Sequence, residues 1–283
     1  MSLKLENLEH KYNAGTALES YAIQGVSLEI DKGEFVGLIG RTGSGKSTLI
    51  QHFNGLLKPT GGRILFDGKD IYEKGYSLKT LRQKVGLVFQ YPEYQLFEET
   101  IIKDVAYGPM NKGLSRDEAY EKAHRALQMV GIPQEIYNKS PFEISGGQKR
   151  RVAVAGVLAI EPEYLILDEP TAGLDPEGRE AVLSLFKALQ EKLGITVILV
   201  SHSMEDVARY AKRLIVMNRG KAAFDGTPHS VFRHVDELEE MGLSAPQAVH
   251  IARALREAGY DISDDTITVE ELAKSLIGYM KKC

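Results

Sequence analysis

The stretch that decides the fold is Gly40-Arg41-Thr42-Gly43-Ser44-Gly45-Lys46-Ser47-Thr48. It matches G-x-x-x-x-G-K-S, in which glycine backbone N–H groups and a helix N-terminus surround a phosphate. The apolar run 35–39 before it is typical of a buried strand, and residues 49–53 continue it as a helix. This order predicts a P-loop, with Lys46 reaching the β- and γ-phosphates and the Ser47 hydroxyl holding Mg²⁺.

The bulk composition is that of an ordinary globular protein of one or two domains. The chain has 283 residues, of which 43% are hydrophobic and 26% charged. Its net charge of −4 argues against a nucleic-acid partner held by phosphate contacts. The one cysteine, Cys283, allows no intrachain disulfide and fits a reducing compartment. No signal peptide or membrane span is recognisable, so we expect any work at a membrane to need another chain as the spanning part.

The N-terminal part of the chain reads as strands that lead into the P-loop. Residues 3–8 alternate apolar and polar side chains, which predicts an edge strand. Residues 13–22 read as a loop, and the runs 26–30 and 34–39 around Asp31-Lys32-Gly33 predict a hairpin.

Residues from about 98 to 163 read as helices and loops inserted into an α/β core. A capping box at 115–118 predicts a helix through Val130. Strands at 164–167 and 195–200 then alternate with helices, which predicts a mostly parallel sheet. We therefore expect a P-loop NTPase core with an antiparallel β subdomain over residues 1–234, and a small helical extension over residues 235–283.

The strand 164–168 ends in two carboxylates that suit nucleotide chemistry. On a sheet beside the P-loop strand, Asp168 would hold Mg²⁺ through water. Glu169 would face the γ-phosphate and orient or deprotonate the attacking water. The plainer alternative is an acidic pair at a helix start.

A second decisive stretch is Ile144-Ser145-Gly146-Gly147-Gln148, between the helical insert and the Asp168 strand. By itself it could be a helix start with Ser145 as the N-cap. Together with the P-loop it resembles the signature of the ATP-binding-cassette ATPases, with Ile144 in place of the usual leucine. The resemblance implies that Ser145, Gly146, Gly147 and Gln148 contact ATP bound to the opposite subunit of a dimer.

The resemblance assigns further roles, residue by residue. It implies that Tyr12 stacks on adenine and that Gln90 senses Mg²⁺ and the membrane partner. It places Asp175 in the D-loop at the dimer seam, and makes His202 the switch histidine that contacts the γ-phosphate. Glu169, His202 and Gln90 are thus the expected catalytic residues, and Ser47, Gln90 and Asp168 the expected Mg²⁺ ligands.

A narrower resemblance is to the ATPases of energy-coupling factor importers, of the A-prime or cobalt-type kind. It rests on 89–97, Phe-Gln-Tyr-Pro-Glu-Tyr-Gln-Leu-Phe, and on 153–159 and 168–176. It implies an ATPase on the cytoplasmic face of the membrane, paired with a second ATPase subunit, identical or not. An integral membrane coupling protein and a substrate-capturing membrane subunit would complete an importer of a vitamin or a transition metal ion such as cobalt or nickel.

Other functional classes remain open at this point. They are the ATPase of a conventional cassette transporter, and a soluble cassette protein of translation or DNA repair. The segment 91–97 bears on the choice, because its tyrosines and Phe97 suit a groove for a helix of the coupling protein. The alternative is that Leu96 and Phe97 pack the helical insert onto the core.

Overall fold

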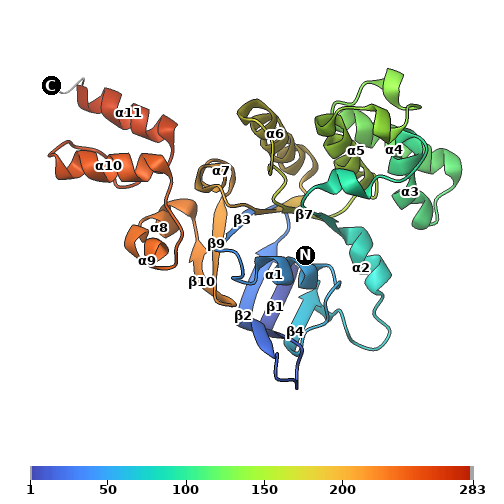
Figure 1. Ribbon diagram of the computed structural model, residues 1–283, viewed down its shortest axis with the longest axis horizontal. Helices are drawn as coiled ribbons and strands as arrows, with labels where there is room; N and C mark the ends of the chain where they lie inside the picture. The colour runs from blue at the N-terminus through green and yellow to red at the C-terminus, as the bar shows by residue number, and fades with distance from the viewer. Residues whose placement is uncertain (1, 281–283) are drawn as a thin grey trace.

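The computed structural model describes residues 2–280, so Cys283 lies outside the described residues. A six-stranded sheet forms the centre of the molecule (Figure 1). Its strands, in sheet order, are β10 (Lys221–Gly226), β9 (Arg213–Asn218), β3 (Phe35–Ile39), β8 (Thr196–Val200), β7 (Tyr164–Asp168) and β6 (Val85–Val88). All neighbours pair in parallel except β10 with β9, so the predicted, mostly parallel sheet is confirmed.

The central sheet is buried on both faces, and this explains its nearly continuous apolar strands. On β7, Leu165 and Leu167 face one core, while Tyr164 and Ile166 face the other. The helices pack on the first face, and the N-terminal sheet with α1 (Lys46–Phe53) covers the second. With both faces covered, ligands of a sheet of this kind bind outside the C-terminal ends of its parallel strands.

A four-stranded antiparallel sheet is built from β2 (Ser20–Asp31), β1 (Ser2–Tyr12), β4 (Gly61–Phe66) and β5 (Lys69–Asp70), in that order. The prediction of an edge strand at 3–8 is wrong, because β1 pairs on both sides. The predicted hairpin is also wrong, since β2 and β3 belong to different sheets and the turn after Asp31 carries the chain between them. Strand β2 begins inside the loop expected at 13–22.

The predicted helical insert contains α3 (Ile101–Asn111), α4 (Arg116–Met129) and α5 (Gly146–Leu158). Helix α4 opens with the expected capping box, in which Ser115 and Glu118 exchange hydrogen bonds. Helix α2 (Leu78–Lys84) precedes β6, and the 3-10 helix η1 (Pro92–Gln95) follows it, before α3. The 3-10 helices η2 (Gln134–Ile136) and η3 (Pro141–Glu143) lie between α4 and α5. The two remaining core helices are α6 (Pro176–Leu193) and α7 (Met204–Tyr210).

The C-terminal part is helical, as predicted, and lies at the opposite end of the molecule from the insert (Figure 1). It comprises α8 (Pro228–Phe232), α9 (Val235–Glu240), α10 (Gln247–Glu257) and α11 (Val269–Met280). Leu238 belongs to the large core, whereas Ala252 and Leu272 join α10 to α11 in a small core of their own. The division at 234/235 stays a prediction.

Candidate active site

Four of the expected motifs meet at the C-terminal ends of the parallel strands, along one edge of the central sheet. The P-loop follows β3, Gln90 follows β6, Asp168 ends β7 and His202 follows β8. Parallel strands end on the same side, so the topology brings these motifs together across four adjacent strands. The expectation that the Asp168 strand neighbours the P-loop strand is wrong in one respect, because β8 lies between them.

Two of the P-loop glycines are required by backbone geometry. Gly40 has a φ of 153°, and a Cβ there would lie 2.4 Å from the carbonyl oxygen of Met217. Gly45 has a φ of 104°, and its Cβ would lie 2.5 Å from the carbonyl oxygen of Ala22. Neighbouring strands thus approach the loop so closely that only glycine fits, and the loop is held in shape from behind.

Lys46 lies in the first turn of α1 with its ammonium folded back over the loop. Its Nζ donates to the carbonyl oxygen of Gly40 at 2.5 Å and to that of Arg41 at 3.2 Å. Burial lowers the pKa of Lys46, and the nearby charges of Glu169 and Asp168 oppose that shift. The site therefore holds a cation beside two carboxylates, where phosphate oxygens can replace the carbonyl contacts.

The three expected catalytic side chains are in direct contact. The Glu169 carboxylate accepts a hydrogen bond from Gln90 Nε2 at 3.1 Å and lies 2.8 Å from His202 Nε2. Glu169 itself has a left-handed backbone, with φ at 51°, which turns the chain sharply after β7. A carboxylate fixed from two sides is suited to orient a water for attack on a phosphate.

The residues expected to hold Mg²⁺ fit such an ion. Ser47 is exposed at the start of α1, and Asp168 and Gln90 end two strands of the same edge. Burial, and then the charge of Glu169, raise the pKa of the Asp168 carboxyl, so a cation beside it would favour its ionised form. Hydroxyl, carboxylate and amide oxygens are hard donors of the kind that Mg²⁺ prefers. Within residues 2–280, no cluster of three His, Cys, Asp or Glu forms a separate metal site.

Tyr12 lies beside the P-loop helix. Its hydroxyl is 3.1 Å from Thr48 Oγ1, and its ring packs edge-on against His10 at 4.7 Å between centroids. The ring stays partly open to solvent, with 41% of the residue exposed. A tyrosine held in this way can offer a ring face to a base, and the adenine contact stays a prediction.

The signature residues lie apart from the P-loop within this chain. Ser145 caps α5, where its side chain and that of Gln148 form a capping box. Ser145, Gly147, Gln148 and Asp175 line a cavity of about 570 Å³ between α4, α5 and α6, and no P-loop residue lines it. Within one chain, the P-loop and the signature residues therefore line two separate cavities.

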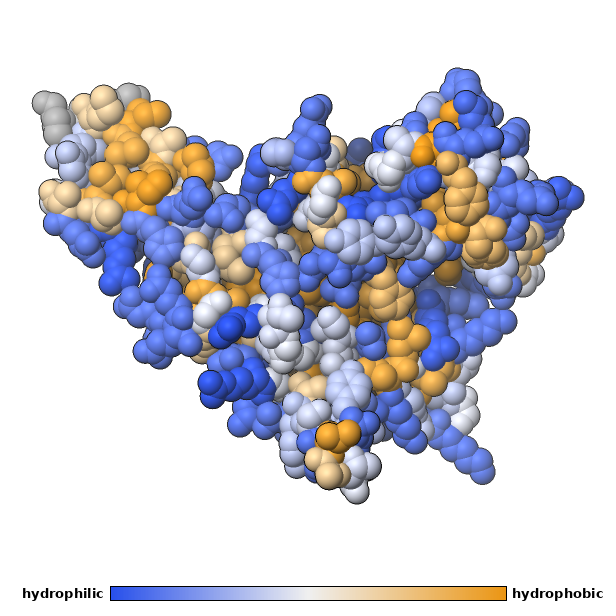
Figure 2. Space-filling view, viewed as in Figure 1, coloured by the Kyte–Doolittle hydropathy of each residue, from blue (hydrophilic) through white to orange (hydrophobic). Residues whose placement is uncertain are grey.

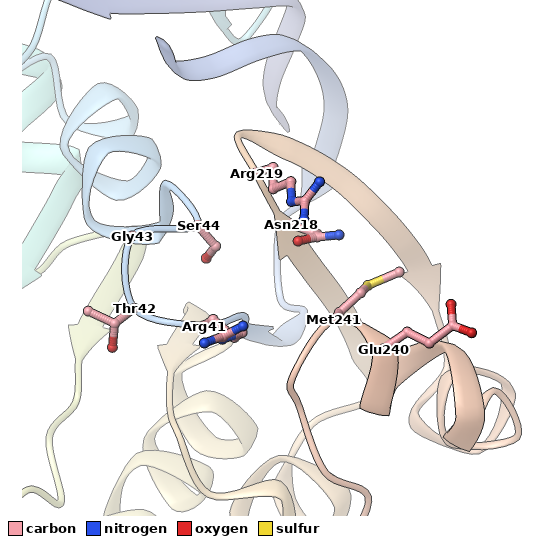
Figure 3. A pocket seen from close by; sticks show the side chains of 8 residues that line it. All are labelled: Arg41, Thr42, Gly43, Ser44, Asn218, Arg219, Glu240 and Met241. Atoms are coloured by element: carbon pink, nitrogen blue, oxygen red, sulfur yellow. The ribbon is translucent and has the colours of Figure 1, made fainter. Parts of the chain in front are cut away.

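Sequence reasoning missed the neighbours of the P-loop that come from the far end of the chain (Figure 3). A cavity of about 170 Å³ lies beside Arg41 and Ser44 of the P-loop. It is also lined by Asn218 at the end of β9, Arg219 in the turn that follows, and Glu240 and Met241 at the end of α9. The sequence signals only a turn at 218–220, and nothing in it places α9 beside residue 41. Gly242 touches this loop closely enough that a Cβ would lie 2.7 Å from Arg41 Cδ.

Known proteins resemble this chain in both amino-acid sequence and three-dimensional structure. Residues 23–172 match the ABC transporter family. The energy-coupling factor transporter ATP-binding protein EcfA2 of Clostridium tetani is 58% identical over 98% of this chain and 96% of its own length. The structure of cbiO1 from Clostridium perfringens, described as part of the ABC transporter complex cbiONQ, superposes with a TM-score of 0.74. It is 42% identical, over 84% of this chain and 93% of its own.

A second solved structure bears on the nucleotide. The ATP-binding cassette MJ0796, in a dimeric post-hydrolysis state bound to ADP and Pi, has a TM-score of 0.71 and 32% identity. The match covers 80% of this chain and 98% of that one. With the P-loop, the Gln90–Glu169–His202 contact and the signature helix already in place, these relationships settle the family: the chain is an ABC transporter ATPase of the energy-coupling factor ATP-binding group.

Proposed function

We propose that this protein hydrolyses ATP with Mg²⁺ to power an energy-coupling factor importer from the cytoplasmic face of the membrane. The observation that carries the proposal is the Glu169 carboxylate held between Gln90 and His202, on the sheet edge that also bears the P-loop. Lys46 and the P-loop amides would bind the phosphates, and Ser47, Asp168 and Gln90 would hold the ion. When bound, Mg²⁺ neutralises charge that develops on the phosphates.

The reaction follows from the placement of this chain's own groups. Glu169 orients the attacking water and takes its proton, because the bond from Gln90 and the contact with His202 fix its carboxylate. His202 is exposed and lies 2.8 Å from this carboxylate, and it would turn away from it to contact the γ-phosphate. Each group acts on charge that appears only during transfer, which is where binding accelerates a reaction.

We propose that the working unit is a dimer, with either an identical or a sister ATPase subunit. The P-loop and the signature residues line different cavities in one chain, so a second subunit is needed to bring a signature to each nucleotide. Figure 2 shows apolar side chains gathered over α10 and α11 at one end of the molecule. The exposed apolar residues of α11 include Val269, Ile277 and Met280, with 67%, 53% and 74% exposed, and such a surface suits a contact between subunits.

The membrane partners are proposed from the segment after Gln90. Tyr94 is 84% exposed and Phe97 58%, and both would lie against a cytosolic helix of a coupling protein. Within residues 2–280 no helix is both long and apolar enough to serve as a membrane span. The cargo would be a vitamin or a transition metal ion, captured by a separate membrane subunit.

The proposal is tested by Glu169→Gln, which keeps the shape of the side chain but removes the carboxylate charge. We expect ATP still to bind, while turnover falls by about a hundredfold or more, the scale for loss of a base or water-orienting group. ATP should then trap the closed dimer, which gel filtration with and without a sister subunit would detect. Turnover near the wild-type rate, or a monomer under every ATP condition, would contradict the proposal.

A further inference from the structure

The side chain of Arg150 joins three segments that are distant in sequence. It projects from α5, five residues after Ser145, and only 5% of the residue is exposed. Its Nε donates to Glu93 Oε2 at 3.2 Å, and its Nη2 to Glu93 Oε1 at 3.1 Å. This paired contact ties the signature helix to η1, the segment that carries the exposed Tyr94.

The other edge of the same guanidinium binds the loop of the catalytic glutamate. Nη1 donates to the carbonyl oxygen of Pro170 at 3.2 Å and to that of Ala172 at 2.8 Å. Both carbonyls belong to the chain between Glu169 and the D-loop. The planar fork thus makes four hydrogen bonds in fixed directions, which a lysine ammonium could not reproduce.

These contacts form a closed ring of interactions beside the active site, which runs from Gln90 to Glu169, along the loop to Arg150, and through Glu93 back to Gln90. Gln90 reaches Glu169 directly, and Glu93 reaches the next residues of the same loop through Arg150. Glu93 and Arg150 have side chains only 17% and 6% exposed, so their charges are poorly solvated and the pair resists separation. A displacement of η1 must therefore move the loop 169–172 and α5 with it.

We propose that Arg150 is the positioning residue that couples the membrane-facing segment 91–97 to the catalytic glutamate and to the signature helix. The inference rests on the proposed function, because it assumes that a membrane partner contacts Tyr94. Arg150 acts through Glu169 and α5, and it lines the cavity of the signature residues rather than that of the P-loop.

Arg213 supplies a matched control at the opposite end of the sheet, where β9 begins. Its Nε and Nη2 donate to the two carboxylate oxygens of Asp225 at 2.7 and 2.8 Å, and its Nη1 donates to the carbonyl oxygen of Glu29 at 2.8 Å. Arg213→Lys therefore breaks a similar paired contact without touching the ring. Glu93→Gln is the second test variant, because it keeps the shape of Glu93 and leaves the carbonyl contacts of Arg150 in place.

The first measurement is steady-state ATP hydrolysis by the full chain. In Arg150→Lys and Glu93→Gln we expect kcat to fall by at least about tenfold, a modest cost for a misplaced catalytic group, with KM for ATP nearly unchanged. The double variant should fall no further than Arg150→Lys, since both changes break one ring. Arg213→Lys should keep the wild-type kcat. Wild-type kcat in both test variants, or additive losses, would overturn the proposal.

The second measurement is hydrogen exchange with and without the magnesium complex of AMP-PNP. The amides of Phe97 and Glu98 each donate to Asp104 Oδ2 at 2.8 Å and report on this segment. We expect nucleotide to change exchange over 91–98 in the wild type and in Arg213→Lys, but not in the two test variants, while 40–48 responds in all four. A retained response at 91–98 in the test variants, or none in the wild type, would overturn the proposal.

The design separates this inference from the proposed function. Absence of ATP hydrolysis by the wild type would refute the function, whereas the exchange experiment needs nucleotide binding alone. If Arg150→Lys does not fold, as thermal unfolding would reveal, Glu93→Gln decides both measurements.

Discussion

At the scale of single residues, Lys46 shows how the fold prepares a charge for a ligand. The ammonium is buried against backbone carbonyls, and burial lowers its pKa while two carboxylates oppose that shift. This arrangement does little for the folded chain itself, since a buried charge is costly. We attribute it to the phosphates that the ammonium would meet.

Lys46→Ala should abolish ATP hydrolysis, because the phosphates lose their counter-charge. A steady-state phosphate-release assay measures this, with thermal unfolding to show that the variant is folded. Hydrolysis near the wild-type rate would refute the assignment of the P-loop.

His52 predicts a pH dependence of stability. It is fully buried behind the P-loop, its Nδ1 donates to the carbonyl oxygen of Thr48 at 2.7 Å, and its Nε2 has no partner among the described residues. Burial lowers its pKa to about 4. The folded state therefore resists protonation, while the unfolded state takes up a proton near pH 6.5, so stability is lost as pH falls from about 6.5 toward 4.

The expected loss reaches about 3 kcal/mol near pH 4 if His52 acts alone. His52→Asn removes the titrating group but keeps a hydrogen-bond donor for Thr48. The free energy of unfolding of this variant should therefore depend less on pH between about 6.5 and 4. Denaturant unfolding between pH 4 and 7 measures it, with His234→Asn at an exposed histidine as the control. An equal pH slope in wild type and His52→Asn would contradict the prediction.

At the scale of elements, the first turn of α5 contains two glycines, which make a helix less stable. Gly146 and Gly147 are exposed, and a Cβ at either would meet nothing within 4 Å. Glycine inside a helix costs roughly 1 kcal/mol relative to alanine. Packing within this chain therefore does not explain the two glycines, which suit the close approach of the partner subunit that we propose.

Gly147→Asp should abolish hydrolysis while nucleotide still binds to the variant's own P-loop, because the new anion would face the partner's γ-phosphate. Nucleotide titration and phosphate release measure the two effects, and Gly147→Ala reports on folding, with stability equal to or above the wild type. If Gly147→Asp loses ATP affinity as strongly as activity, the signature helix supports this chain's own fold instead.

At the scale of the whole molecule, the residues of the segment after Gln90 fall into two groups. The sequence left open whether the segment packs the helical insert onto the core or contacts a partner, and its residues differ in this respect. Leu96 is buried in the large core, which confirms packing for that residue. Phe97 stays exposed and meets Tyr107 edge-on at 4.9 Å between ring centroids. The exposed aromatics therefore remain available to a partner.

Tyr94→Ala combined with Gln95→Ala should leave the purified chain folded and able to bind ATP. The pair should weaken assembly with the membrane subunits, or stop uptake in reconstituted vesicles while ATP is still hydrolysed. Leu18→Ala, at a residue 77% exposed before β2, is the control for loss of an exposed apolar side chain. Normal assembly and uptake would remove the segment from the coupling path, and a large fall in melting temperature would assign it to packing.

Much of this protein follows from the sequence itself, because its motifs are local. The P-loop, the two carboxylates at the end of β7 and the signature helix are each set by a short run of residues, so the sequence predicted their chemistry without knowledge of any contact. The alternation of helices and strands likewise indicated the parallel sheet.

Only the tertiary structure decided how these pieces meet. Strand order is set by long-range pairing, so the sequence could not show that β8 lies between the P-loop strand and β7, or that β2 and β3 belong to different sheets. Side chains that meet across large separations, such as Glu93 with Arg150, carry no local signal. Their contact depends on the packing of the insert against the sheet, and that packing turns separate motifs into one connected site.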